Sequence, residues 1–351
     1  MKVTAFTRYG PRAASTRQRF VQYFPALREA GIHVDHHPLL GDDYVASLAT
    51  GEHYPPTRVV RAYGGRLDQL MASRDADVFW VYVELLPYFP AMIERLAAGG
   101  KPIVYDFDDA FFHAYDQGPN PFVPTLLGDK HASLLKRAAA CCCGNDYIQA
   151  FAAQYCDRTM VVPTVVDTDA YRPAPGDEAP LTIGWIGSPS TWRGVRPILP
   201  VLEKVVAAHG ARFLVVGAGR AAAADSFPDK GVGDWGRAAR IAHVQAMHVG
   251  IMPLLDRPFE RGKSGYKLIQ YMACGLPVVA SPVGVNAQIV KDGANGFLAS
   301  TDAQWTGALT KLLGDAELRR QLGANGREQA VSHFSLDSQK GRLVSLFKSL
   351  V

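Results

Sequence analysis

The sequence predicts an α/β protein with two domains, each built on a doubly wound parallel sheet, and three observations support this prediction. A length of 351 residues corresponds to two domains at roughly 150 residues per domain. Short apolar runs alternate with helical patterns from the first residues onward, which is typical of βαβ units. This alternation stops over residues 167–180, a stretch with three prolines, and then starts again. We therefore expect two similar-sized α/β domains that face each other across a cleft.

The first half of the chain is expected to form a Rossmann-like domain over residues 1–165. Its predicted strands lie at residues 3–6, 32–36, 78–83, 103–105 and 138–143, its predicted helices at 17–30 and 91–98, and a run at 161–163 closes it. The last strand contains the adjacent residues Cys141, Cys142 and Cys143. We interpret them as small buried strand residues rather than as metal ligands.

A linker over residues 166–180 is predicted to lead into a second Rossmann-like domain over residues 181–334. Its expected strands lie at 181–186, 213–216, 249–253, 278–280 and 296–298, and its helices at 196–208, 266–274, 305–313 and 316–331. A final amphipathic helix over residues 335–351 could pack back toward the first domain. In such folds ligands bind at the carboxyl ends of the strands, so the loops that follow strands are the first candidates for a site.

The composition excludes several classes of protein. Apolar residues make up 48% and charged residues 20%, so disordered and disulfide-scaffold proteins are excluded. A net charge of +4 over this length is too small for general nucleic-acid binding. No apolar run approaches the roughly 18 residues of a membrane span, and the first residues lack the apolar stretch of a signal peptide. Five cysteines without a CxxC pair favour a reducing, cytoplasmic location.

The segment 259–284 is the richest in chemistry, because a glycine-containing, basic loop follows a strand and leads into a helix. Free backbone N–H groups at Ser264, Gly265 and Tyr266 would lie at the positive end of that helix, where a diphosphate binds well. Three cations would add charge-assisted hydrogen bonds: Arg261, Lys263 and Lys267. The alternative is a solvated basic turn with no ligand.

This segment resembles the donor-binding signature of the family 4 retaining glycosyltransferases, which have the GT-B fold. Residues 270–279, Gln-Tyr-Met-Ala-Cys-Gly-Leu-Pro-Val-Val, match the second half of that signature. Gln270 stands where the family has a glutamate that holds the ribose hydroxyls, and Gly262 stands where it has an earlier glutamate. Glu260 lies two positions before Gly262. The similarity is greater to a subgroup with a Lys-Ser-x-x-Lys loop, here Lys263 to Lys267.

The resemblance extends along much of the chain. Residues 183–191 are similar to the first strand and loop of the donor domain, which implies donor contacts from Gly187 and Ser188, and Arg193 stands where the family has a phosphate-binding lysine. The resemblance implies transfer of a sugar from a nucleoside diphosphate sugar to a glycan, lipid-linked or small-molecule acceptor, with retention of configuration. It implies neither a metal nor a separate cofactor, because the basic loop would neutralise the departing diphosphate.

A second candidate site follows the strand 103–105, where Asp106, Asp108 and Asp109 lie close together. These residues could cap a helix, form the Asp-x-Asp metal site of a GT-A enzyme, or place Asp106 as the nucleophile of a haloacid-dehalogenase phosphatase. Under the glycosyltransferase hypothesis we expect Asp106 to bind the acceptor. Asp108, Asp109 and His113 are then expected to act in the active site together with Lys267.

The loop after the first strand is basic, and the chain has no acidic residue before Glu29. Gly10 permits close approach of the backbone, and Arg12, Arg17 and Arg19 could reach an anionic donor or acceptor. The alternative is a basic surface that lies on anionic lipid headgroups.

Two further observations leave other functions open. Residues 217–222 fit the Gly-x-Gly-x-x-Ala pattern of a dinucleotide site, but they follow the second strand of their domain, whereas this pattern normally follows the first. Trp235 could stack on a base.

Since both signature glutamates are absent, a catalytically inactive GT-B module that binds a nucleotide or glycan is the main alternative to an enzyme.

Overall fold

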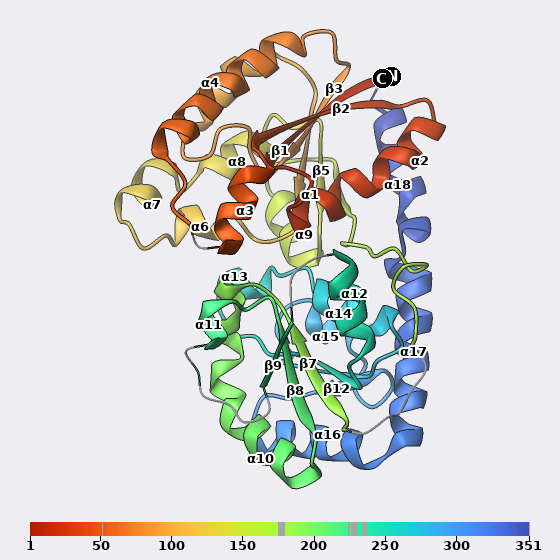
Figure 1. The fold of residues 1–351 in the computed structure, drawn as a ribbon. Coiled ribbons are helices and arrows are strands. Elements are labelled where there is room, and N and C mark those ends of the chain that lie inside the picture. Colours follow the sequence, from red (N-terminus) through yellow and green to blue (C-terminus); the bar gives the residue numbers. More distant parts are fainter. Residues whose placement is uncertain (51, 175–179, 224, 226–229, 234–236, 351) are drawn as a thin grey trace. The chain divides into compact units, whose positions relative to one another are not determined.

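The structure is a computed structural model that describes residues 1–50, 52–174, 180–223, 225, 230–233 and 237–350 (Figure 1). Trp235 and most of the linker's second half, residues 175–179, lie outside the described residues. Contacts divide the chain into two units. The first comprises residues 1–164, 262–264 and 339–351, and the second comprises residues 165–261 and 265–338. Among the described residues, no helix is long and apolar enough to cross a lipid bilayer.

The first unit contains a parallel sheet of six strands in the order β2-β1-β3-β4-β5-β6. The strands are β1 (Lys2–Tyr9), β2 (His33–Leu40), β3 (Val78–Tyr82), β4 (Ile103–Phe107), β5 (Ala140–Cys143) and β6 (Thr159–Val161). Its helices are α1 (Ala14–Arg19), α2 (Phe24–Glu29), α3 (Asp42–Thr50), α4 (Pro56–Ala72), α5 (Ala91–Ala97), α6 (His113–Asp116), α7 (Phe122–Leu127), α8 (Lys130–Leu135) and α9 (Asp146–Ala152).

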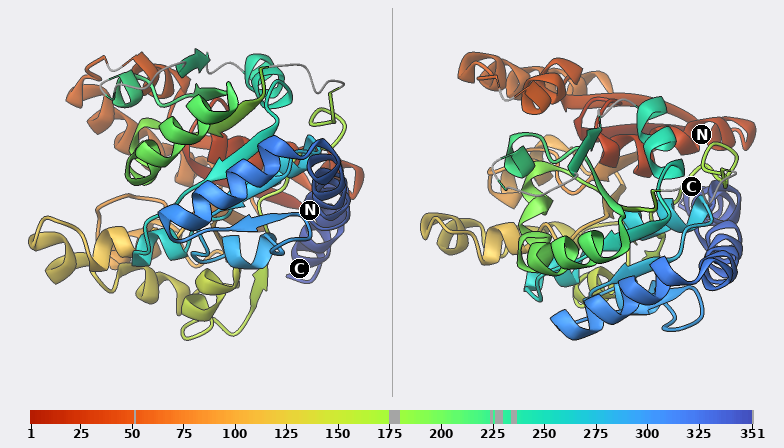
Figure 2. Two further views of the ribbon diagram at one scale, coloured as in Figure 1. Left: turned by 90° about the horizontal axis from the view of Figure 1, so that it is seen from below. Right: turned by 60° about the horizontal axis from the view of Figure 1, so that its bottom comes forward.

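The second unit also has a six-stranded parallel sheet, in the order β12-β11-β10-β7-β8-β9. Its strands are β7 (Thr182–Ile186), β8 (Arg212–Val216), β9 (Lys230–Gly233), β10 (Val249–Met252), β11 (Val278–Ala280) and β12 (Gly296–Leu298). Its helices are α10 (Leu199–His209), α11 (Arg220–Ala223), α12 (Arg237–Gln245), α13 (Pro258–Arg261), α14 (Tyr266–Ala273), α15 (Asn286–Ile289), α16 (Asp302–Gly314) and α17 (Ala316–Phe334). The last helix, α18 (Leu336–Lys348), belongs to the first unit from residue 339 onward. Among the helices coloured blue in Figure 2 are α16, α17 and α18.

The core of the second unit has two layers, one on each face of its sheet. Successive residues of a strand point to opposite faces, and the adjacent residues Trp185 and Ile186 accordingly belong to different core clusters. Trp185 packs with residues of α10 and α16, whereas Ile186 packs with residues of α14. This sandwich of helix, sheet and helix explains why the strands read as continuous apolar runs.

Local sequence signals set several helix ends. Thr301 and Gln304 form a reciprocal capping box at the start of α16, and Gly210 ends α10 in the left-handed conformation. The helix predicted over residues 17–30 is instead divided into α1 and α2, because Pro25 fits only the first turn of a helix.

The predicted fold class is confirmed, since both sheets are parallel and Rossmann-like. The prediction that Cys141, Cys142 and Cys143 are buried strand residues is also confirmed, because all three lie in β5 and are fully buried. In the first unit, helices α3 and α4 and helices α6 to α9 were not predicted.

Candidate functional site

The topology of each sheet marks where a ligand would bind. In the second unit the strand order reverses between β7 and β10. The carboxyl ends of the parallel strands form one edge of the sheet, which we call the carboxyl edge, and the loops after β7 and β10 leave it in opposite directions. In doubly wound folds the ligand binds in the crevice at such a switch point. The loop of residues 187–193 and residues 253–261 and 265–267 are therefore the candidate donor site of this unit. Of the predicted donor residues they contain Gly187, Ser188, Arg193, Arg261, Gly265 and Tyr266.

The loop after β7 is shaped by a glycine and by hydroxyl groups. A Cβ on Gly187 would come within 2.3 Å of the Trp185 ring and 2.8 Å of Thr191 Oγ1, so only glycine fits there. Ser188 N–H donates to Thr191 Oγ1 at 3.1 Å, and the Ser188 and Thr191 hydroxyls lie 3.5 Å apart. This arrangement gathers backbone and hydroxyl donors at the carboxyl edge, where they could bind phosphate oxygens.

Lys267 joins this cluster from the first turn of α14. Its Nζ lies 3.3 Å from Thr191 Oγ1 and 4.4 Å from the centre of the Trp185 ring, a cation–π contact. Gly265 is the N-cap of α14 with φ of 68°, and a Cβ there would meet Ile289 at 2.4 Å. The positive end of an eight-residue helix and a lysine ammonium therefore lie together, which suits a diphosphate.

Arg193 and Glu260 form an ion pair beside this cluster. The Arg193 guanidinium donates to Oε1 of Glu260, whose side chain is only 6% exposed. The other carboxylate oxygen, Oε2, is buried and has no hydrogen-bond partner among the described residues. A buried acceptor of this kind is costly unless a ligand or water satisfies it, so Glu260 joins the candidate site.

Two other predicted donor residues have partners of their own. Arg261 makes two hydrogen bonds to Asp256, at 2.6 and 3.1 Å, on the exposed surface. Gln270 is buried, and its Nε2 donates to Tyr171 Oη at 2.7 Å. This bond uses the NH₂ group of the amide, whereas the predicted ribose contact would use the carbonyl oxygen, so the ribose role of Gln270 stays a prediction.

In the first unit the strand order reverses between β1 and β3, so the carboxyl edge near residues 8–13 and 83–90 is its candidate ligand site. Asp106 lies in β4 beneath that edge and is 1% exposed. Its Oδ1 accepts from Arg19 Nε at 2.7 Å and its Oδ2 accepts from Trp80 Nε1 at 3.2 Å. This corrects two predictions, because a carboxylate held in this way is placed neither to bind an acceptor nor to act as a phosphatase nucleophile. Arg19 is likewise a buried structural residue rather than a ligand contact.

Asp108 and Asp109 follow β4 and lie at the edge itself, and their active-site role stays a prediction. Asp108 Oδ1 accepts from Tyr82 Oη at 2.8 Å, and burial, together with the charge of Asp109, raises the pKa of Asp108 to about 7. Asp109 accepts from Lys263 Nζ at 2.6 Å and from Ser264 N–H at 3.3 Å. By their contacts Lys263 and Ser264 belong to the first unit, so Lys263 is paired with a carboxylate rather than grouped with Lys267.

The raised pKa of Asp108 predicts a pH-dependent stability. The folded carboxyl binds its proton more tightly than the unfolded one does, so its contribution is complete below about pH 4 and is lost as the pH rises through about 7. Asp108→Asn keeps an acceptor for Tyr82 and cannot ionise. Urea unfolding at pH 5 and pH 8.5 should show the wild type losing about 1–3 kcal/mol more than Asp108→Asn over this interval. Equal losses in the two proteins would contradict the assignment.

His113 begins α6 and has partners at both ring nitrogens. Nδ1 lies 3.0 Å from both carboxylate oxygens of Asp116, and Nε2 lies 2.9 Å from Tyr147 Oη. The side chain is 11% exposed. His113 therefore links Asp116 to Tyr147, and a ligand would have to replace one of these bonds to reach the imidazole.

The loop after β1 is folded onto itself and onto α3. A Cβ on Gly10 would come within 2.4 Å of Asp42 Oδ1, and the same carboxylate oxygen accepts from Arg12 N–H at 2.9 Å. Arg17 donates to the carbonyl oxygens of Pro11 and Arg12 at 3.4 and 3.0 Å. Arg12 is exposed at the tip of the loop, while Arg17 stabilises the conformation of the loop.

Sequence reasoning missed a buried ion network under this edge. Glu84 follows β3, binds Arg8, and accepts from Lys130 Nζ at 2.6 Å and from Tyr115 Oη at 2.8 Å. Lys130 also lies 2.7 Å from Glu94. Val83 has a φ of 63°, a strained conformation for a β-branched residue, and such strain persists only where the surroundings fix it. Glu84, a charged residue directly after an apolar strand, is the feature of the sequence that could have indicated this network.

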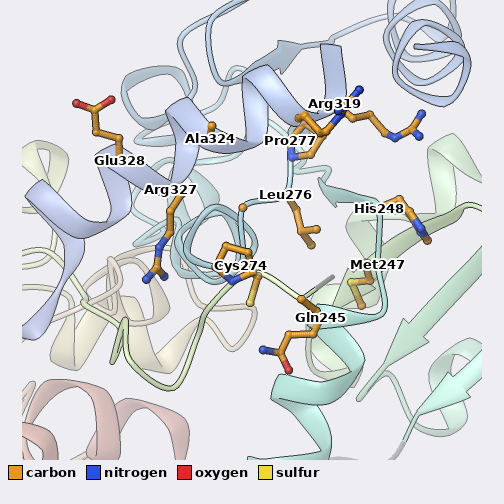
Figure 3. Close-up of a pocket in the computed structure, with 14 residues that line it drawn as sticks. Gln245, Met247, His248, Cys274, Leu276, Pro277, Arg319, Ala324, Arg327 and Glu328 are labelled. Carbon is orange, nitrogen blue, oxygen red and sulfur yellow. The ribbon is translucent and has the colours of Figure 1, made fainter. Parts of the chain in front are cut away.

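A cavity of about 580 Å³ in the second unit lies away from the candidate donor site. It is lined by His248 and Pro277, which precede β10 and β11, so it adjoins the amino ends of the strands. Figure 3 shows Arg319, Ala324, Arg327 and Glu328 on one helix above it, with the Glu328 carboxylate directed away from the cavity floor. Arg327 donates to backbone carbonyls, including Thr168 O at 2.9 Å, and so has a structural role.

Within the described chain, no group of three His, Cys, Asp or Glu residues could hold a metal ion.

Comparison with known proteins agrees with the geometry. Residues 180–315 match the family described as "Glycosyl transferases group 1". Over 118 residues the chain is 29% identical to N-acetyl-alpha-D-glucosaminyl L-malate synthase of Bacillus anthracis, covering 33% of this chain and 29% of that protein. Over 75 residues it is 36% identical to alpha-maltose-1-phosphate synthase of Mycolicibacterium smegmatis, covering 19% of each. The matches therefore span less than a third of these curated relatives.

Solved structures share the fold over almost the whole chain. Anabaena Alr3699/HepE in complex with UDP-glucose has a TM-score of 0.73 at 15% identity, covering 99% of this chain and 100% of that one. Sucrose-phosphate synthase from Thermosynechococcus elongatus has a TM-score of 0.72 at 17% identity, covering 100% and 99%. These likenesses show the GT-B fold. Residues 180–315 are therefore similar to the group 1 glycosyl transferases.

Proposed function

We propose that the protein transfers a sugar from a nucleoside diphosphate sugar to an acceptor hydroxyl, with the donor bound by the second unit and the acceptor by the first. The observation that carries the proposal is the position of Lys267, which lies with the hydroxyl of Thr191 and the positive end of α14 at the switch point of the second sheet. A nucleotide's diphosphate is the natural ligand of such a cluster. The structure of Alr3699/HepE with UDP-glucose supports a uridine donor.

The chemistry we propose needs no metal. The bond between the anomeric carbon and the donor phosphate oxygen breaks, and the acceptor oxygen bonds to the anomeric carbon from the same face, so configuration is retained. Negative charge develops on the leaving diphosphate, where Lys267, the Ser188 and Thr191 hydroxyls and the backbone N–H groups of α14 would stabilise it. The acceptor's proton goes to the departing phosphate oxygen, which releases the nucleoside diphosphate.

The test is donor binding followed by donor hydrolysis. A thermal-shift screen of UDP-, GDP-, ADP- and dTDP-sugars should give one base with the largest stabilisation, since a ligand that binds only the folded state raises its stability. Slow release of nucleoside diphosphate without an acceptor would then show an enzyme. Stabilisation without any release under all acceptor conditions would favour the inactive nucleotide-binding module, for which the absence of both signature glutamates is the argument. No stabilisation by any donor would refute both.

Chelation of metals should leave activity unchanged. EDTA at millimolar concentration is expected to have no effect on donor hydrolysis or transfer, because the compensating charge comes from the chain itself. The measurement is the initial rate after dialysis against EDTA, compared with the rate after addition of Mg²⁺ or Mn²⁺. A rate that depends on the added metal would overturn the metal-independent mechanism.

We also infer a cytoplasmic location from the cysteines. All five are free and buried, as is common in proteins of reducing compartments.

A further inference from the structure

Asn145 is a buried residue in the turn between β5 and α9, and its side chain is bonded on three sides. Its Oδ1 accepts from Ile148 N–H at 3.0 Å, which makes Asn145 the N-cap of α9. Its Nδ2 donates to Gly262 O at 3.0 Å and to Lys263 O at 3.1 Å. The residue is 3% exposed. The oxygen and both hydrogens of the amide group are therefore engaged.

The cap of α9 does not by itself require asparagine. Serine, threonine and aspartate cap a helix about as well, because each offers a side-chain oxygen as acceptor. Of these residue types, only asparagine also has two N–H groups to donate. Here both reach backbone carbonyls that lie 117 and 118 positions away in sequence, and a buried carbonyl that loses its donor is costly. The two donated bonds are thus a second role of Asn145, distinct from the cap.

The receiving segment, residues 262–264, belongs by its contacts to the first unit, although the residues on either side of it belong to the second. A Cβ on Gly262 would come within 2.2 Å of a side chain in the loop after β4, so this residue is closely packed. Asp109 accepts from Lys263 Nζ at 2.6 Å and from Ser264 N–H at 3.3 Å. Together with the two amide bonds, these contacts fix every residue of the segment to the loops after β4 and β5.

This segment leads directly into the helix end that we assign to the diphosphate. The next residue, Gly265, is the N-cap of α14. Because the chain is fixed up to residue 264, the first N–H groups of α14 have fewer conformations to lose when an anion binds. Donors that are already in place also need no reorganisation as negative charge develops on a leaving group.

We propose that Asn145 is a positioning residue of the donor loop, which holds the carbonyl groups of Gly262 and Lys263 and so fixes the segment that leads into α14. The proposal rests on the proposed function, because it concerns the same diphosphate site. Asn145 acts through residues 262–264 and not by touching the donor. Its replacement should therefore lower kcat more than it weakens binding of the nucleoside diphosphate, since precise placement of donors matters most in the transition state.

Two variants separate the two roles of Asn145. Asn145→Asp keeps the oxygen that caps α9 and loses both donated bonds, whereas Asn145→Ala loses the cap as well. Amide hydrogen exchange of the full chain, followed by mass spectrometry, reports local opening. Both variants should speed exchange over residues 262–266 by about tenfold or more. Only Asn145→Ala should also speed exchange in the first turn of α9.

Kinetics then test the effect on the reaction. With UDP-glucose, or the nucleotide sugar that stabilises the protein most, both variants should lower kcat of donor hydrolysis by about tenfold or more. Calorimetry should show the matching nucleoside diphosphate bound less than about threefold more weakly. Asp315→Ala is the matched control, because it removes the N-cap bond to Leu318 N–H, 2.9 Å long, at the start of α17. It should change both quantities by less than about twofold.

Three outcomes would overturn the proposal: unchanged exchange over residues 262–266 in both variants, an affinity that falls as much as kcat, or a wild-type kcat in Asn145→Asp beside a low kcat in Asn145→Ala. The last result would leave Asn145 as a helix cap only. Failure of the proposed function has a different result, since the wild type would then neither bind nor hydrolyse any nucleotide sugar. The exchange measurement would still decide whether Asn145 holds this segment.

Discussion

Lys130→Met is expected to destabilise the first unit by about 3–5 kcal/mol, because it removes the lysine that pairs with both Glu84 and Glu94 in a buried ion network. The Lys130 side chain is fully buried, and its ammonium lies 2.6 Å from Glu84 and 2.7 Å from Glu94. It also donates to Leu86 O at 2.7 Å. The methionine has a similar length and apolar stem, so lost packing contributes little to the difference.

The pKa values of the two glutamates show how much the network depends on this lysine. Burial alone would raise the pKa of Glu84, but Lys130, His131 and Arg8 hold it below its ordinary value. Burial keeps the pKa of Glu94 above its ordinary value even with Lys130 present. Without Lys130 the pKa of each carboxyl should rise, that of Glu94 further above its ordinary value, so the loss of stability in Lys130→Met should be larger at pH 8 than at pH 5.

Urea unfolding of the full chain, followed by circular dichroism and by tryptophan fluorescence, measures this effect. Lys136→Met is the matched control, since Lys136 directly follows the same helix and is exposed. It should change the free energy of unfolding by less than about 0.5 kcal/mol. Adding Glu94→Gln to Lys130→Met should recover part of the lost stability, because it removes the buried carboxylate that has lost its lysine partner. A destabilisation of Lys130→Met no larger than that of the control would refute the network's structural role.

The sequence predicts the sheets well because parallel strands buried on both faces are continuous apolar runs. The strand β5 is an example, since its cysteines lie on both faces and all are buried. The helix α4 was missed because Gly64 and Gly65 interrupt its pattern and its core-facing residues include Arg66, a charged side chain that is 1% exposed. Arg66 is buried because its guanidinium donates to the backbone carbonyls of His37 and Thr7. Only the tertiary structure shows such partners.

For the candidate site, the sequence locates the segments better than it assigns the roles. It placed Arg261, Lys263 and Lys267 together as phosphate ligands. In the structure Arg261 is paired with Asp256 and Lys263 with Asp109, while Lys267 joins Thr191 and Trp185. Spacing along the chain indicates which residues follow a strand. It does not show which carboxylate will neutralise which cation, because that depends on loops far apart in sequence.

Lys267→Ala should therefore have a larger effect on catalysis than replacement of either neighbouring cation. Removal of one preorganised donor at a developing negative charge typically lowers kcat by about 10²–10³-fold. Lys267 is positioned for this role because Trp185, which is fully buried, and Thr191 hold its ammonium in place. Its stabilisation should be greater in the transition state than in the ground state, since the diphosphate gains charge as the sugar leaves.

Steady-state kinetics of donor hydrolysis give kcat and KM separately, and calorimetry gives the affinity for the nucleoside diphosphate. We expect Lys267→Ala to lower kcat by about 10²-fold or more and to weaken diphosphate binding by about 1–3 kcal/mol, the contribution of a hydrogen bond to a charged group. Lys267→Arg should retain part of the activity, because the charge is kept while the geometry changes. Lys204→Ala, on the exposed face of α10, is the control and should leave both quantities unchanged. An unaltered kcat in Lys267→Ala, with the fold intact by circular dichroism, would remove this lysine from the active site and with it the observation on which the proposed donor site depends.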